Sequence, residues 1–337
     1  MSLRMGIIYL LYLSLGEPIK PSMTDFREPK SVLTYAKTNI GGDVQSCTKL
    51  TGGICNYVYR LHFNDRTVVL KQFPSTLASN IDYPFSQDRY FVEKEALTKF
   101  SKLNSGNVKV PRLIFCQDEE FVLVMEDAGE NIVSLMDYFK VCNSRLTWND
   151  LPESIVQFLK TLHNVDRSSC SSIFTNTLAR QTNQSFYDNL NLQASRLQLN
   201  SLKPYSSVKL PPIPSNPAII MGDCWPNSIH LDFTTNTIWI LDWEFCRFGR
   251  GFDDLAQCAA NLWLLEQKPD ENDVALLKSF RQDLIKQYVR ETNTVIDNED
   301  QIRLLVYVVL LANFSNWAFK DPTSIIDKAA QITNSIF

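Results

Sequence analysis

Two segments in the second half of the chain each place a carboxylate directly after an apolar, strand-like run. Asp223 follows residues 218–221, and Asp242 follows residues 237–241, with Glu244 two positions later. Mg²⁺ prefers oxygen ligands, and a magnesium–phosphate site uses one or two carboxylates together with the phosphates. A separate carboxylate can accept the proton of an attacking hydroxyl group. The pattern points to phosphoryl transfer, although aspartates that only close a hairpin turn would show the same spacing.

A glycine turn and a strand lysine in the first half of the chain fit the same chemistry. Gly52 and Gly53 separate two strand-like runs, and glycine lets the backbone approach a phosphate closely. Lys71 ends a β-rich run, from which a lysine can reach a phosphate as a point charge. Glu95, on the predicted helix 89–103, is the carboxylate expected to orient Lys71. Each feature alone is common, because paired glycines are mostly turns and such lysines and glutamates mostly face solvent.

The order of these parts makes them informative together. A glycine turn, a strand lysine, a helix glutamate, a linker, an aspartate-bearing loop and a strand-end aspartate follow one another as in protein-kinase-like phosphotransferases. The chain resembles the aminoglycoside phosphotransferase and choline kinase superfamily, in particular its fungal branch and the related methylthioribose kinases. The resemblance covers about residues 45–260 and is carried by segments 50–60, 70–72, 93–97, 122–127, 222–226, 242–244 and 252–256.

The resemblance implies an enzyme that transfers the γ-phosphoryl group of ATP to a hydroxyl of a small molecule. It makes Asp223 the catalytic base, and Asp242, Glu244 and Ser228 the ligands of Mg²⁺. The residues that it places around ATP are Gly52, Gly53, Asn56, Lys71, Glu95, Met125 and Glu126, the last two in a linker whose backbone would bind adenine. Asp254 is expected to support the structure rather than to bind the metal.

The acceptor is expected to be a small molecule rather than a protein. The sequence contains no His-Arg-Asp, no Asp-Phe-Gly and no Ala-Pro-Glu motif. The interval between Asp242 and Asp254 is also too short for a peptide-docking segment. The identity of the acceptor stays open, because aminoglycosides, choline, thioribose and other sugar-like alcohols are all used on this scaffold.

Two departures from the family pattern motivate an alternative. Met221 stands where a histidine usually precedes the Gly-Asp of the catalytic loop, and Ser228 stands where an asparagine usually binds the metal. A serine hydroxyl is a weaker Mg²⁺ ligand than an amide oxygen. The alternatives are therefore a catalytically silent kinase-fold protein that binds a nucleotide or another ligand, and a scaffold without any nucleotide.

The composition indicates a folded chain of two lobes. The 337 residues are 45% hydrophobic and 21% charged, and the net charge of −4 without a Lys/Arg run argues against a nucleic-acid partner. We predict an α+β, bilobal, protein-kinase-like fold. A small antiparallel β-sheet N-lobe for the nucleotide is expected over residues 44–128, and a larger, mainly helical C-lobe for catalysis and substrate over residues 129–337. Residues 1–43 are predicted to form an N-terminal extension.

Hydrophobic periodicity and turn residues give the expected elements. Hairpins are predicted at 57–63 with 67–71 and at 111–116 with 121–125, and short strands at 218–221 and 237–241. Helices are predicted at 89–103, 151–163, 254–265, 273–291 and 299–319. The polar segment 168–216 is expected to be rich in loops with at least one helix. His163 lies on an apolar helix face and is interpreted as a core residue.

The cysteines and the N-terminus bear on the compartment. Eight cysteines without a C-x-x-C pair favour a reducing, cytoplasmic environment. Residues 5–15 form an apolar stretch behind Arg4 that has the outline of a signal peptide. A helix packed on the body and initiation at Met23 are the alternatives. The stretch is too short to span a bilayer, so no membrane partner is expected; the oligomeric state is left open.

Overall fold

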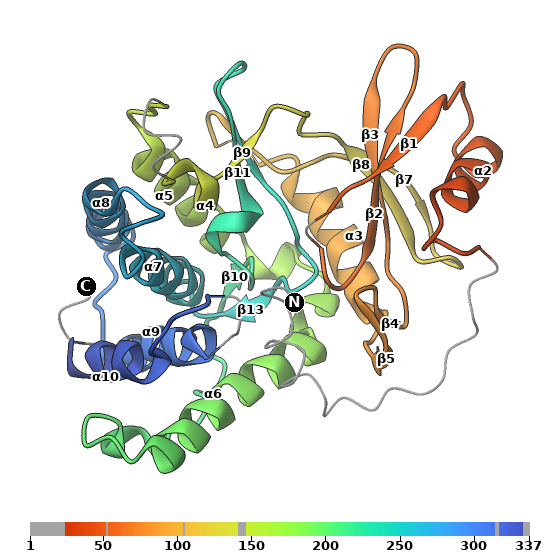
Figure 1. The fold of residues 1–337 in the computed structure, drawn as a ribbon. Coiled ribbons are helices and arrows are strands. Elements are labelled where there is room, and N and C mark those ends of the chain that lie inside the picture. The colour runs from red at the N-terminus through yellow and green to blue at the C-terminus, as the bar shows by residue number, and fades with distance from the viewer. Residues whose placement is uncertain (1–23, 52, 104, 141–145, 314–316, 333–337) are drawn as a thin grey trace.

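The computed structural model describes residues 24–332 except 52, 104, 141–145 and 314–316. The signal-like stretch 5–15 and Gly52 therefore lie outside the described residues. Figure 1 shows two lobes, one built on a β-sheet and one mainly helical, with α3 (Asp88–Phe100) between the sheet and the larger lobe. The predicted α+β, bilobal architecture is confirmed.

The N-lobe is a five-stranded antiparallel sheet with the order β1-β2-β3-β8-β7. Its strands are β1 (Ser46–Lys49), β2 (Tyr57–His62), β3 (Thr67–Gln72), β7 (Leu113–Gln117) and β8 (Val122–Glu126). Side chains alternate along a strand, and in β2 the buried positions are Tyr57, Tyr59 and Leu61. Both predicted hairpins are present. A further small hairpin pairs β4 (Thr76–Leu77) with β5 (Asn80–Pro84).

The segment predicted as an extension contributes to the core of the N-lobe. Helix α2 (Pro29–Asn39) buries Val32, Tyr35 and Ala36 in one cluster with residues of the sheet. Tyr59 donates a hydrogen bond from its hydroxyl to the Phe26 carbonyl at 2.8 Å. Structurally, the N-lobe therefore includes residues from about position 26 onward.

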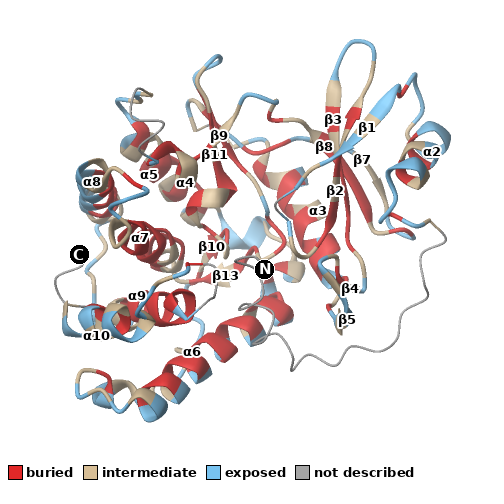
Figure 2. Ribbon diagram, viewed as in Figure 1, coloured by how far each residue is buried: buried red, intermediate tan, exposed pale blue. Residues whose placement is uncertain are grey.

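The C-lobe consists mainly of helices that bury their apolar faces against one another, as the red inner faces in Figure 2 show. They are α4 (Leu135–Tyr138), α5 (Leu151–His163), α6 (Thr177–Leu197), α7 (Phe252–Glu266), α8 (Val274–Thr292), α9 (Asn298–Ala312) and α10 (Pro322–Ile332). The helix predicted at 299–319 is confirmed over 299–312, but its C-terminal end is wrong. Helix α9 ends at Ala312. A separate helix begins at Pro322, where proline suits the first turn.

Short strands at the centre of the molecule position the acidic segments. Strand β10 (Ala218–Ile220) pairs with β13 (Arg247–Gly249). A second sheet has the order β6-β12-β11-β9 and is formed by β6 (Val108–Lys109), β9 (Val133–Ser134), β11 (Ile229–Asp232) and β12 (Thr237–Ile240). Asp223 thus follows β10 and Asp242 follows β12, as predicted. Among the described residues, no helix is long and apolar enough to cross a bilayer.

Candidate active site

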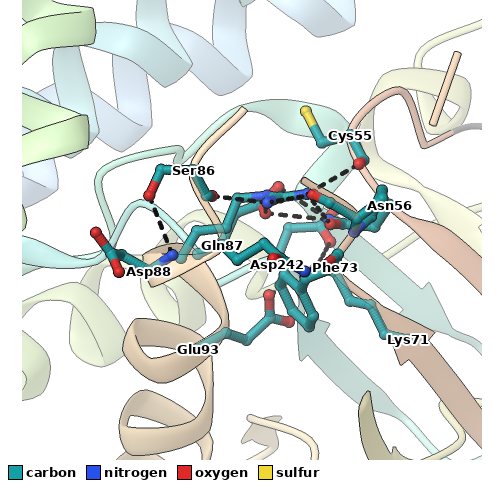
Figure 3. A network of polar contacts seen from close by, with 12 residues as sticks. Cys55, Asn56, Lys71, Phe73, Ser86, Gln87, Asp88, Glu93 and Asp242 are labelled. Carbon is teal, nitrogen blue, oxygen red and sulfur yellow. Dashed lines mark hydrogen bonds and ion pairs between the residues drawn. The ribbon is translucent and has the colours of Figure 1, made fainter. Parts of the chain in front are cut away.

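Lys71 connects carboxylates from the two lobes. Its Nζ atom lies 2.7 Å from Glu93 Oε2 on α3 and 2.9 Å from Asp242 Oδ1 after β12 (Figure 3). The side chains of Lys71 and Glu93 are 4% and 1% exposed, whereas that of Asp242 is 52% exposed. One face of the Asp242 carboxylate therefore remains open to solvent.

The partner of Lys71 is Glu93, so the prediction of Glu95 is wrong. Two residues along an α-helix correspond to a rotation of about 200°, and Glu95 accordingly lies at a partly exposed position of α3. Glu93 precedes Ala96 and Leu97, both buried, by three and four residues. This helical spacing would have marked Glu93 as the inward-facing glutamate of the pair.

The charges around Lys71 keep its ammonium group protonated. Burial by itself lowers the pKa of Lys71, but the carboxylates of Asp242, Glu93 and Glu244 outweigh it and hold the pKa above its ordinary value. Burial also raises the pKa of Glu93, an effect that Lys71 opposes. A permanently charged ammonium at this position suits a contact with phosphate oxygens.

Arg89, which sequence analysis missed, ties the end of the glycine turn to Glu244. The Arg89 side chain is fully buried; its Nη2 atom donates to the Cys55 carbonyl at 3.1 Å and to Asn56 Oδ1 at 3.0 Å. Its Nε atom lies 3.1 Å from Glu244 Oε2. Asn56 Nδ2 completes the network with hydrogen bonds of 3.1 and 3.0 Å to the two Glu244 oxygens. Glu244 is thus held between an arginine and an amide.

Asp223 lies half-buried beside Gln257, a second residue that sequence analysis missed. Gln257 Nε2 on α7 donates to Asp223 Oδ1 at 2.6 Å. Burial raises the pKa of Asp223 to about 7; the Gln257 hydrogen bond opposes this shift, and the charges of Asp242 and Glu244 add to it. A carboxylate with a pKa near neutrality is suited to accept a proton from a hydroxyl group at physiological pH.

Asp254 holds the loop that carries Asp223. Its two carboxylate oxygens accept hydrogen bonds of 2.8 Å from the backbone amides of Met221 and Gly222. His163 binds Asp254 Oδ2 through Nε2 at 3.1 Å and the Tyr288 hydroxyl through Nδ1 at 2.9 Å. The geometry agrees with the supporting role predicted for Asp254 and the core position predicted for His163. The loop is held in place without a histidine at position 221.

Gly222 is required by the close approach of the neighbouring chain. Its φ of +80° lies in the left-handed region, and a Cβ atom there would lie 2.1 Å from the Phe245 carbonyl oxygen and 2.4 Å from Arg247 Nη1. Arg247 Nη1 donates to the Gly222 carbonyl at 3.2 Å. Gly222 is therefore held by Asp254 through its amide and by Arg247 through its carbonyl.

The residues predicted to hold Mg²⁺ differ in their availability. Asp242, with its exposed carboxylate and a φ of +63°, offers the most accessible oxygens. Ser228 is fully buried, and its hydroxyl has no hydrogen-bond partner among the described residues. Glu244 is occupied by Asn56 and Arg89. Within the described part of the chain, no group of three or more His, Cys, Asp or Glu side chains is arranged to hold a metal, so phosphate oxygens would have to supply further ligands.

The other described residues predicted to bind the nucleotide lie at the end of β8 and in the turn before β2. Met125 pairs with Val69 near the end of β8 and is buried, and Glu126 follows it. The Glu126 amide donates to the Arg112 carbonyl at 2.9 Å, and Glu126 lies opposite Val68 of β3. Gly53 precedes Asn56 in the turn before β2.

This two-lobed arrangement of a strand lysine, a helix glutamate and two strand-end aspartates defines a small-molecule kinase of the protein-kinase-like class. Residues 46–288 match the phosphotransferase enzyme family, and the chain belongs to that family. It is 24% identical over 322 residues to a 4-hydroxytryptamine kinase from Psilocybe cyanescens, covering 87% of this chain and 88% of that protein. The protein is an ATP-dependent phosphotransferase that acts on a small molecule, as the sequence predicted.

Solved structures with the same fold include two groups of kinases. A choline kinase from Cryptosporidium parvum Iowa II superimposes with a TM-score of 0.55 at 11% identity, covering 92% of this chain and 95% of that one. An ADP-bound aminoglycoside phosphotransferase superimposes with a TM-score of 0.51 at 13% identity, covering 90% and 96%. At these identities the likeness concerns the fold.

Proposed function

We propose that Asp223 is the catalytic base of this kinase and that Lys71, oriented by Glu93, positions the phosphates of ATP. The observation that carries the proposal is the Lys71 ammonium between Glu93 of the N-lobe and Asp242 of the C-lobe. Phosphoryl transfer depends mainly on positioning and on electrostatic stabilisation of the transferred group. A cation fixed between the lobes meets both needs, and the nearby Asp223 would accept the hydroxyl proton of the acceptor.

Asp242 is proposed as the main protein ligand of Mg²⁺, with Ser228 and Glu244 as further candidates. A magnesium ion bound there would neutralise charge on the β- and γ-phosphates. Glu244 would have to share its carboxylate with Arg89. The Ser228 hydroxyl has no hydrogen-bond partner among the described residues, but it is fully buried and would have to become accessible to the ion. Gly53, Asn56 and the neighbouring Gly52 would cradle the phosphates.

The proposed nucleotide site predicts magnesium-dependent stabilisation by ATP. ATP with Mg²⁺ is expected to raise the Tm of the wild type, because a ligand that binds only the folded state stabilises it. The Asp242→Asn variant should lose the magnesium-dependent part of the shift, whereas Asp283→Asn at an exposed position of α8 should keep it. The measurement is a thermal-shift titration with and without Mg²⁺. Equal shifts in all three proteins would contradict the assignment of Asp242.

The pKa of Asp223 predicts the pH dependence of the reaction. A base acts in its deprotonated form, so kcat should fall as the pH drops below about 7, by up to about tenfold per unit, and reach a plateau above it. Because the Gln257 hydrogen bond lowers the pKa of Asp223, Gln257→Leu should move the inflection to higher pH. Initial rates between pH 5.5 and 8.5 at constant free Mg²⁺ test this; an inflection that does not respond to the substitution would argue against Asp223 as the titrating group.

The acceptor is proposed to be a small hydroxyl-bearing molecule. The named substrate of the Psilocybe relative, 4-hydroxytryptamine, and the choline of the structural neighbour are the first compounds to test. ATP consumption above the acceptor-free rate would identify an acceptor.

A further inference from the structure

A pocket lies in the C-lobe between α6, α9 and the segment that follows Glu244. Its walls include Arg180 and Tyr187 on α6, Arg247 and Asp253 near β13 and α7, Arg303 on α9, and residues 210–214. In Figure 1, α6 and α9 run side by side at the base of the lobe. The volume open to the centres of water molecules is about 40 Å³, more than the roughly 10–15 Å³ that a single water needs. A small polar group has room in this pocket.

Arg303 is a buried guanidinium with unused donors. Its side chain is 4% exposed, and its Nη2 atom donates to Asn183 Oδ1 at 2.7 Å and to Asp253 Oδ2 at 3.2 Å. Its Cζ atom lies 5.6 Å from the centre of the Tyr187 ring and 5.0 Å from that of Tyr307. Within the described part of the chain, its Nε and Nη1 atoms have no hydrogen-bond partner. Buried donors without acceptors are costly, so an anion that reached these atoms would form hydrogen bonds that the protein itself does not supply.

The charges at this end of the pocket favour an anion. The Asp253 carboxylate faces two buried guanidinium groups, because Arg247 Nη2 also lies 3.5 Å from Asp253 Oδ2. Arg180, partly exposed on the pocket wall, forms no side-chain hydrogen bond or ion pair with another described residue. Two guanidinium groups thus face the Asp253 carboxylate, and Arg180 lines the same pocket.

The other end of the pocket has the opposite character. Arg250 is paired with three carboxylates, those of Asp297, Glu299 and Asp300, at 2.6 to 2.9 Å. These three carboxylates would repel an anion. Arg250 is already paired with them and is poorly placed to bind another negatively charged group. The Arg303 end is therefore the place for a negatively charged group.

We propose that this pocket binds the carboxylate or phosphate group of a small ligand, held by Arg303 and Arg180 beside Asp253. Guanidinium groups bind both anions through strong, charge-assisted hydrogen bonds. The pocket borders the catalytic loop, since Arg247 also donates to the Gly222 carbonyl. Anion binding here does not depend on the proposed roles of Asp223, Lys71 or Asp242.

Thermal unfolding with malonate or inorganic phosphate, at an ionic strength held constant with NaCl, tests the proposal. At about ten times the Kd, either probe should raise the Tm of the wild type by roughly 2–4 °C beyond the effect of chloride. The shift, measured against the ligand-free Tm of each variant, should persist in Lys71→Ala, which alters the proposed nucleotide site, and in the exposed control Arg290→Ala. It should be lost in Arg303→Gln and reduced in Arg180→Ala. A response to only one probe identifies the ligand as a carboxylate or as a phosphate.

Two results would overturn the proposal. Equal shifts in all variants would mean general stabilisation by anions excluded from the protein surface. A shift lost only in Lys71→Ala would place the anion in the nucleotide site. If Arg303→Gln does not fold, the wild type is compared with Arg180→Ala instead, because Arg180 lies at a partly exposed position. The magnesium-dependent ATP shift, measured on the same proteins, reports separately on the proposed nucleotide site.

Discussion

Replacing Asp223 with asparagine is expected to lower kcat by about 10²–10⁴-fold while ATP still binds. The amide is close in size and can still interact with Gln257, but it cannot accept the proton of the attacking hydroxyl group. The loop should keep its shape, because Asp254 holds it through the backbone amides of Met221 and Gly222 rather than through the Asp223 side chain. Steady-state kinetics with the cognate acceptor and a separate ATP titration measure the two effects.

The matched control is Asp283→Asn, which removes the same charge from an exposed position of α8. It should leave both kcat and ATP affinity unchanged. Unchanged turnover in Asp223→Asn would remove this residue from the catalytic role. Loss of ATP binding together with turnover would instead indicate that Asp223 supports the nucleotide site.

Replacing Glu93 with glutamine is expected to destabilise the protein by about 3 kcal/mol and to weaken ATP binding. Removing one member of a buried ion pair typically costs about 3–5 kcal/mol, and the lower figure applies because Asp242 still pairs with Lys71. Without Glu93, the Lys71 ammonium loses the carboxylate that draws it toward α3. Urea denaturation and an ATP titration provide the measurements.

Glu95→Gln is the matched control for this experiment, since it makes the same chemical change two residues along the same helix. At its partly exposed position, the substitution should change the free energy of unfolding by less than about 0.5 kcal/mol. Equal effects of the two substitutions, or a larger effect at Glu95, would contradict the Lys71–Glu93 pair. The comparison therefore tests whether Glu93 or Glu95 is the residue of α3 that faces Lys71.

Local sequence patterns were sufficient for the fold class and for the main acidic residues. The alternation in 57–63 and 67–71 predicts the central hairpin because side chains of a strand alternate between its two faces. Asp223 and Asp242 were identifiable because each follows a short apolar strand, a relation that involves only neighbouring residues. The order of these parts along the chain also predicted the two-lobed kinase architecture.

The partners of these residues were decided by the tertiary structure. Lys71 meets Asp242 across 171 positions of sequence, and Asn56 meets Glu244 across 188. Local periodicity contains no information about such pairs, because they form only when the lobes pack. Helix phase, set by the burial of Ala96 and Leu97, selected Glu93 over Glu95 as the partner of Lys71. Packing of α9 on α6 likewise brings Arg303 to Asn183. The same packing leaves the Nε and Nη1 atoms of Arg303 without a partner among the described residues. No local sequence pattern indicates either result.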